Sequence, residues 1–185
     1  MMVERRTLDI AGPIVVAPKR TGDQRGFFSE TYNARAFREI GIDRSFVQDN
    51  HTWSPERGTV RGFHFQAPPH AQAKLIRVSR GRILDVFVDI RRGSPTYGEH
   101  ASIELSAENW LQVFLPERIA HAFCTLEPDT EVLYKVTDHW MPGSEGGFRW
   151  NDPALKIAWP SLAGASVSPR DQALPLLADF VSPFA

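Results

Sequence analysis

The chain has 185 residues, a formal net charge of -1 and a pI near 6.6, which argues against proteins that attract nucleic acid or membrane phosphate with a broad basic field. Its composition, 42% hydrophobic and 23% charged, is typical of a single globular domain, here residues 1–185. A lone cysteine, Cys124, excludes an internal disulfide, and the absence of a membrane-length apolar run or an export signal predicts a cytoplasmic location.

Short apolar segments separated by Gly, Pro, Asn and Asp predict a mostly β structure. The predicted strands are Pro13–Ala17, Val60–Gln66, Lys74–Ser79, Arg82–Ile90, Ala101–Leu105, Trp110–Leu115 and Val132–Thr137. Two short helices are predicted, one over Ala34–Ile40, which ends at Gly41, and one in a C-terminal piece after Ser168. Many short strands at such spacing indicate an all-β sandwich or a closed barrel.

The strand Arg82–Ile90 has two unlike faces, because side chains alternate along a strand. One face mixes carboxylates with apolar side chains and carries Ile83, Asp85, Phe87 and Asp89. The other face is wholly apolar and carries Leu84, Val86, Val88 and Ile90. The apolar face is the better candidate for packing between two sheets. Asp85 has the parity needed to support a histidine on the mixed face.

The strand Val60–Gln66 holds one histidine among aromatic residues. Alternation places His64 on the face opposite Phe63 and Phe65, so it is predicted to point into an interior pocket while the rings pack. Arg61 has the wrong parity to join His64 in a regular strand. It can reach the same pocket only if the strand is irregular at its entrance.

The histidine pattern does not predict a metal site. A β-barrel metal site usually places two histidines as His-x-His on one strand, but here Gln66 follows His64 at that spacing. The six histidines are otherwise scattered along the sequence. We therefore expect no bound metal.

Acid–base chemistry is the catalytic class that the residues favour. No Gly-x-Ser-x-Gly motif or phosphate-binding glycine loop occurs, and Cys124 lies in an apolar run. Histidine is the side chain best matched to proton transfer near neutral pH. The titratable residues with plausible inward positions are His64, Lys74, Asp85, His121 and Tyr134.

A series of ordered motifs runs from about Asp23 to the C-terminus. They are Asp23–Glu30 (DQRGFFSE), Phe46–Asn50 (FVQDN), Arg61–Gln66 (RGFHFQ), Gln72–Leu75 (QAKL), Asp85–Arg91 (DVFVDIR), Ala120–Phe123 (AHAF), Leu133–Lys135 (LYK) and Trp150–Pro153 (WNDP). Together they resemble the dTDP-4-dehydrorhamnose 3,5-epimerase family. The resemblance implies a cupin-type jelly roll with a few short peripheral helices, a homodimer that exchanges strands near its N-terminus, and catalysis without metal or cofactor.

The resemblance also implies a reaction, the inversion of C3 and C5 of dTDP-4-dehydro-6-deoxy-D-glucose to give dTDP-4-dehydro-L-rhamnose. Such epimerisation next to a C4 ketone needs a base, an acid on the opposite face, and a group that holds the enolate oxygen. By similarity His64 is the base, Asp171 orients its ring, Tyr134 returns the proton and Lys74 stabilises the enolate. Arg61 and His121 would bind the substrate around its sugar or diphosphate.

Further residues are implied to hold the nucleotide of this dTDP-4-keto-6-deoxyhexose substrate. An arginine fork matches phosphate geometry, and amide and carboxylate groups can bind the edge of a pyrimidine. These residues are Arg25, Phe28, Glu30, Gln48, Asp49, Asn50, Glu145 and Arg170. Strand exchange could place the segment Arg25–Glu30 in the site of the partner.

Other interpretations remain open at this point. The chain could invert only one carbon of another nucleotide 4-keto-deoxysugar, or could be a sugar-binding cupin without this activity. Taken alone, His64 could be a structural histidine, Tyr134 a core residue and Lys74 a solvated surface charge. Asp171 could merely complete a helix capping box that begins at Ser168, and the two roles could coexist.

Three positions depart from the pattern of this family. Arg118 and Ala122 stand where glycines are usual, before and after His121, and glycine often marks a positive φ or a close backbone approach. The aromatic pair that usually follows the tyrosine strand is replaced by His139 and Trp140. None of these departures falls on the four residues with implied catalytic roles.

Overall fold

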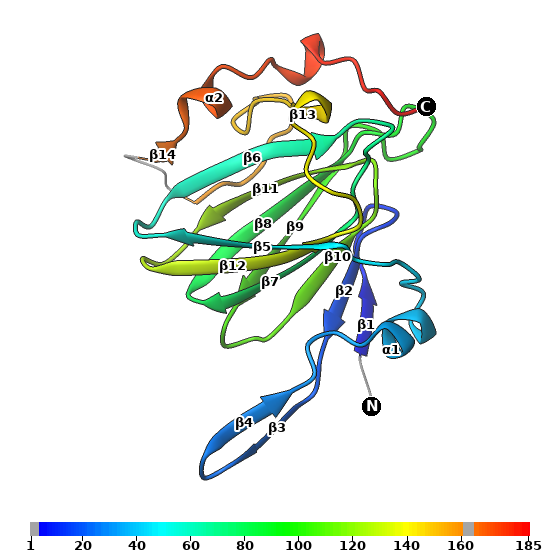
Figure 1. Cartoon of the computed structure of the whole chain (residues 1–185). Coiled ribbons are helices and arrows are strands. Elements are labelled where there is room, and N and C mark those ends of the chain that lie inside the picture. The colour runs from blue at the N-terminus through cyan, green and yellow to red at the C-terminus, as the bar shows by residue number, and fades with distance from the viewer. Residues whose placement is uncertain (1–3, 161–164) are drawn as a thin grey trace.

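The computed structural model describes residues 4–160 and 165–185, which form two facing β-sheets and a protruding hairpin (Figure 1). The first sheet has the order β1 (Glu4–Thr7), β2 (Ile14–Ala17), β10 (Gln112–Leu115), β7 (Lys74–Arg80), β12 (Thr130–Val136) and β5 (Gln48–Ser54). The second has the order β13 (Glu145–Gly147), β6 (Thr59–Gln66), β11 (Ile119–Thr125), β8 (Arg82–Asp89) and β9 (His100–Ser106), and β14 (Ser166–Val167) pairs with β6. The predicted all-β jelly-roll architecture is confirmed.

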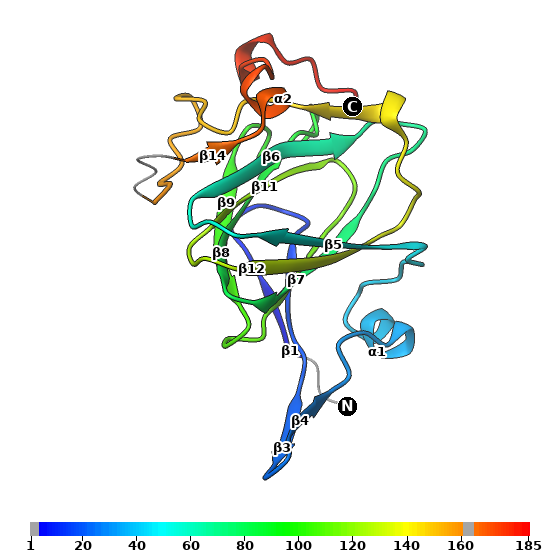
Figure 2. The ribbon, with the colours of Figure 1, turned by 60° about the vertical axis from the view of Figure 1, so that its left-hand side comes forward.

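The hairpin of β3 (Arg20–Asp23) and β4 (Gly26–Ser29) projects away from both sheets, as Figures 1 and 2 show. Helix α1 (Ala34–Glu39) follows it, capped by the side chain of Asn33, and the chain turns at Gly41 with φ +89°. The other helical turns are η1 (Pro142–Ser144), α2 (Pro169–Gln172) and η2 (Leu177–Asp179). In the described ranges no helix is long and apolar enough to cross a membrane.

Every predicted strand coincides with an observed one, and the largest boundary errors are of two residues, one at the start of β12 and one at the start of β10. There the chain turns at Trp110, whose φ is 58°, so pairing begins only at Gln112. Both predicted helices are also present, α1 and α2. Strand β5 was not predicted, because its sequence is polar along most of its length.

The predicted packing of the two faces of β8 is wrong. Ile83 and Phe87, from the mixed face, lie in the core between the sheets together with Val113 of the opposite sheet. The wholly apolar face, which carries Val86, packs outside that core against aromatic residues of the C-terminal segment, among them Phe148. That segment crosses over the second sheet (Figure 2), so both faces of β8 are buried and apolar character alone does not identify the inner one.

Strand β6 is irregular at its entrance, as the parity of Arg61 requires. Gly62 has φ +122°, and a Cβ there would lie 2.5 Å from the carbonyl oxygen of His121 and 2.6 Å from Ala122. The register between β6 and β11 shifts between His121 and Phe123. This irregularity lets Arg61 and His64 line the same cavity.

Arg118 adopts φ 76°, a conformation that favours glycine, and its side chain is exposed. Left-handed backbone costs a residue with a Cβ about 1–2 kcal/mol, partly offset by the greater unfolded-state entropy of glycine. Arg118→Gly is therefore expected to raise the free energy of unfolding by about 0.5–1 kcal/mol, measured by urea denaturation. Arg118→Ala, which keeps the Cβ, is the control; equal stability of the Gly and Ala variants would contradict backbone strain at this turn.

Candidate active site

A cavity of about 550 Å³ lies between the two sheets. His64 and His121 enter it from β6 and β11 of one sheet, and Lys74 and Tyr134 from β7 and β12 of the other. The full lining is Thr52, Thr59, Val60, Arg61, His64, Lys74, His121, Phe123, Tyr134 and the segment Ser166–Asp171. The cavity therefore holds the four residues with implied catalytic roles, with the base candidate and the acid candidate on opposite walls.

The His64 ring is held by the carboxylate of Asp171. The Nε2–Oδ1 distance is 2.7 Å, and the other oxygen, Oδ2, accepts the backbone N–H of Gly62 at 3.1 Å. The side chain of Asp171 is 4% exposed, whereas that of His64 is 35% exposed toward the cavity. This arrangement fixes the ring and leaves its second nitrogen to act on a ligand.

Asp171 also serves the start of helix α2. Ser168 is the N-cap, and its Oγ accepts the backbone N–H of Asp171 at 3.0 Å. Burial would raise the pKa of Asp171, but hydrogen bonds from His64, Gly62 and Ser168 together with the charge of His64 lower the pKa below its usual value. Ser168 therefore caps the helix through the backbone of Asp171, which leaves the carboxylate of Asp171 to pair with His64 and Gly62.

Lys74 and Tyr134 face His64 across the cavity, and Lys74 Nζ lies 3.4 Å from the backbone oxygen of His64. Burial of its ammonium group lowers the pKa of Lys74 to about 8, although the charges of Asp85 and Glu145 act in the opposite direction. The interpretation of Lys74 as a solvated surface charge is wrong. Burial raises the pKa of Tyr134, so this phenol keeps its proton throughout the neutral range.

A second histidine–carboxylate pair lies beside the first. His121 Nε2 is 2.6 Å from Oδ1 of Asp85, and both side chains are buried. Burial lowers the pKa of His121 despite the neighbouring carboxylate, so the ring is neutral at physiological pH. Asp85 was given no role in the reaction, but its parity on β8 predicted that it could support an interior histidine, and its contact with His121 confirms this.

Further polar side chains line a continuation of the cavity beyond His64, Lys74 and Tyr134. They are Gln48, Asn50, Gln66, Gln72, Trp140 and Glu145, and Arg170 closes one side through an ion pair of 2.8 Å with Glu145. The amide of Gln66 donates to the backbone oxygens of His70 and His139 and accepts from the N–H of Met141. At the position where a metal-binding cupin would place a second histidine, this chain thus has a residue that anchors a loop.

The sequence matches the family profile described as dTDP-4-dehydrorhamnose 3,5-epimerase over residues 7–179. The chain belongs to this family. The dTDP-4-dehydrorhamnose 3,5-epimerase of Salmonella typhimurium is 46% identical over 178 residues, which cover 96% of each chain. The crystal structure of the Legionella pneumophila enzyme in complex with dTDP-4-keto-L-rhamnose superposes with a TM-score of 0.93 at 39% identity, covering 97% of this chain and 95% of that one.

Both the sequence and the fold thus assign the chain to the 3,5-epimerase family, and members of this family are isomerases. A relative from Streptomyces niveus, named dTDP-4-dehydrorhamnose 3-epimerase, is 38% identical over 175 residues, covering 94% of this chain and 84% of its own. Proteins similar to this chain therefore carry names for inversion at two carbons and for inversion at one.

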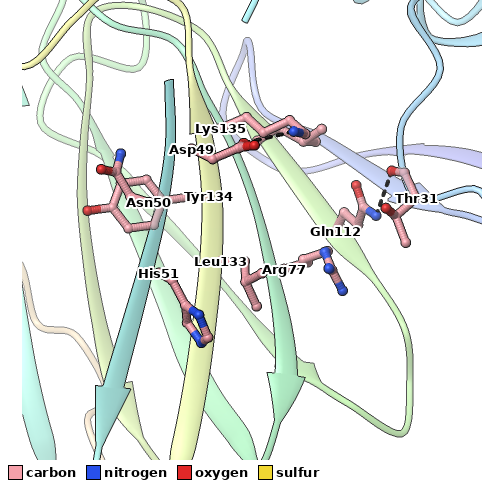
Figure 3. A pocket seen from close by; sticks show the side chains of 10 residues that line it. Thr31, Asp49, Asn50, His51, Arg77, Gln112, Leu133, Tyr134 and Lys135 are labelled. Atoms are coloured by element: carbon pink, nitrogen blue, oxygen red, sulfur yellow. Dashed lines mark hydrogen bonds and ion pairs between the residues drawn. The ribbon is translucent and has the colours of Figure 1, made fainter. Parts of the chain in front are cut away.

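Four residues expected at the site of a 3,5-epimerase are absent from the cavity of their own chain. Arg25 and Phe28 lie on the projecting hairpin and Glu30 just beyond it, where Glu30 accepts a hydrogen bond from Asn33 (Figure 1). Asp49 lies on the outward face of β5, where Lys135 Nζ donates to it at 2.7 Å (Figure 3). The role of these four residues in binding the nucleotide stays a prediction, and for Arg25, Phe28 and Glu30 it would need the site of a partner chain, as strand exchange would allow.

Proposed function

We propose that this epimerase inverts C3 and C5 of dTDP-4-dehydro-6-deoxy-D-glucose, giving dTDP-4-dehydro-L-rhamnose without a metal or other cofactor. The observation that carries this proposal is the His64–Asp171 pair on one wall of the cavity, with Tyr134 and Lys74 on the other. Epimerisation requires a base and an acid on opposite faces of the sugar ring, and this arrangement can supply both.

In the proposed reaction, the free nitrogen of His64 removes the proton from the carbon next to the ketone. The electron pair of the broken C–H bond moves onto the ketone oxygen, and the Lys74 ammonium stabilises the resulting enolate. Tyr134 then delivers its proton to the same carbon from the opposite face, which inverts the centre. The negative charge of Asp171 stabilises the imidazolium formed on His64, and solvent restores both protonation states.

We propose that the remaining polar residues hold the nucleotide sugar. Arg61 and His121 lie on the same side as His64 and would contact the sugar or the diphosphate. The pair of Glu145 and Arg170 flanks the continuation of the cavity, where an arginine fork suits a diphosphate. Gln48 and Asn50 present amides to the same space, as binding to the edge of a pyrimidine requires.

Solvent exchange tests this function directly. Protein treated with EDTA and incubated in D₂O with dTDP-4-dehydro-6-deoxy-D-glucose is expected to place deuterium at C3 and C5 and to form the L-rhamno configuration, both followed by NMR. Inversion at only one carbon would favour a single-site epimerase. Absence of exchange without metal, restored by adding a divalent metal, would contradict the metal-free mechanism.

We also propose that the functional form is a homodimer in which the hairpin enters the site of the partner. Its side chains are free for this role, because Phe28 is 75% exposed and, among the described residues, the Arg25 guanidinium bonds only to Asp23. The outward face of the first sheet also carries a hollow lined by half-buried Arg77 and Leu133 (Figure 3). Trp53, on β5 of the same sheet, is 56% exposed. An uncovered face and a projecting hairpin are features of a self-associating chain.

Hybrid dimers give the decisive measurement. Arg25→Ala and His64→Asn chains should each be inactive, but refolding an equal mixture should restore about one quarter of wild-type activity, because half the dimers are hybrids with one intact site. The restored site contains His64 of one chain and Arg25 of the other. A mixture as inactive as its components would show that Arg25 does not serve the partner.

The chain is further proposed to act as one domain in the cytoplasm, without a nucleic-acid or membrane partner. Its net charge of -1 lacks the basic excess that phosphate-rich partners attract. Cys124 is a free, buried thiol, which suits a reducing compartment.

A further inference from the structure

Asp85 is a buried carboxylate that contacts His121, a residue of the cavity wall, and it has no proton-transfer role in the proposed reaction. It is 0% exposed, and one of its oxygens, Oδ1, accepts the Nε2–H of His121 at 2.6 Å. Its other oxygen, Oδ2, is buried and has no hydrogen-bond partner in the described part of the chain. A half-satisfied buried carboxylate destabilises a fold, so its presence calls for a specific reason.

The bond to Asp85 decides which nitrogen of His121 carries the proton. A carboxylate accepts only, so Nε2 must be the protonated nitrogen and Nδ1 of the neutral ring keeps a lone pair. Nδ1 of His121 has no hydrogen-bond partner among the described residues. This nitrogen is also not fully buried, because it is not among the buried side-chain atoms that lack a partner. Since His121 lines the cavity, this lone pair is available to a ligand.

We propose that Asp85 is a positioning residue of the epimerase: it holds His121 in the Nε2–H tautomer so that Nδ1 accepts a hydrogen bond from a sugar hydroxyl, and it places a negative charge near the ammonium group of Lys74. The proposal deepens the function proposed above and rests on it. Asp85 touches neither substrate nor reacting atoms, and acts only through two residues that do.

The charges around His121 and Lys74 are consistent with this role. Lys74 lies on β7 and His121 on β11, and groups from four other strands face this pair. They are His64 of β6, Asp85 of β8, Tyr134 of β12 and Glu145 of β13. Burial and the positive charge of Lys74 both lower the pKa of His121, which favours the neutral ring. Burial lowers the pKa of Lys74 to about 8, and Asp85 is the first of the two carboxylates that oppose this shift.

Asp89 provides a matched control on the same strand and the same face. It is also 0% exposed, but its carboxylate lies at the end of β8 and is fully occupied by Arg91, Ser94 and Thr96. These partners line neither the cavity nor its continuation, whereas His121, the partner of Asp85, lines the cavity. Replacing it removes a buried carboxylate without altering the charge at Lys74.

The first test needs no variant. The ¹⁵N chemical shifts of the His121 ring in the folded wild-type protein at about pH 7.5 should show a protonated Nε2 and an unprotonated Nδ1. Assignment is made by the loss of these signals in His121→Asn. A ring protonated at Nδ1, or at both nitrogens, would overturn the proposal.

The second test uses the pH dependence of kcat/KM. Asp85→Asn keeps an oxygen that can accept from His121 but removes the charge, so the alkaline limb should move down by about one pH unit. Activity would then fall about eightfold at pH 8.5 and less than about twofold at pH 7. Asp85→Ala also frees the ring and should raise KM about tenfold with a smaller effect on kcat.

Asp89→Asn should lower the thermal midpoint yet leave the alkaline limb where it is in the wild type. If the limbs of the Asp85→Asn and Asp89→Asn variants coincide, Asp85 does not act on Lys74 and the proposal fails. That result is distinct from failure of the proposed function, in which the wild-type protein itself would exchange no deuterium into the substrate.

Discussion

His64→Asn is expected to lower kcat by at least about 1,000-fold and to abolish deuterium incorporation at both C3 and C5. An asparagine amide cannot take up a proton near neutral pH, although it fills much of the space of the ring and can still donate to Asp171. The fold should therefore survive while proton abstraction stops. NMR detection of exchange, with circular dichroism for the fold, makes this measurement.

His70→Asn is the matched control for this variant. His70 Nδ1 also pairs with a carboxylate, Asp138, at 3.0 Å, and its side chain is 35% exposed, as is that of His64. It does not line the cavity, so kcat should stay within about twofold of the wild type. Near-normal turnover by His64→Asn would place the base elsewhere.

Tyr134→Phe is expected to separate exchange from inversion. The variant loses only a hydroxyl, so His64 can still remove a proton and return a deuteron to the same face, while delivery from the opposite face stops. Product formation should fall by about 100- to 1,000-fold, and deuterium should still enter the unreacted substrate at a measurable rate. The raised pKa of Tyr134, caused by its burial, keeps the wild-type phenol protonated and able to donate.

Tyr97→Phe removes the same hydroxyl from an exposed loop and should leave both rates unchanged. The comparison is made in one NMR time course, with deuterium content and product configuration measured together. If exchange and inversion fall by the same factor in Tyr134→Phe, its hydroxyl is not the acid for the opposite face. An unchanged rate of product formation would exclude the role altogether.

Much of the cavity was predictable because strand alternation is local. Alternation alone turned His64 away from Phe63 and Phe65, and the structure places the rings in an outer core while His64 lines the cavity. The parity of Arg61 predicted an irregular strand entrance, and the positive φ of Gly62 provides it. The capping box that begins at Ser168 was equally visible, because it spans four consecutive residues.

Other features depended on which segments meet. Alternation along β8 separated two faces correctly but could not identify the inner one, because both are buried and only the path of the C-terminal segment decides the matter. Asp85 shared the parity of the cavity residues, yet its contact with His121 depends on the pairing of β8 with β11. The polar strand β5 has no apolar pattern and is recognised only by its hydrogen bonds to β12.

The sequence by itself determined the β class, the family motifs and the inward direction of His64, because residue type and period-two alternation are properties of short segments. The pairing of His64 with Asp171, 107 positions away, was implied only by the family resemblance, and the tertiary structure brings the two side chains together. The tertiary structure alone decided that Arg25, Phe28 and Asp49 lie outside the cavity of their own chain. Contacts between distant segments depend on sheet order and on the path of the chain, which no local pattern contains.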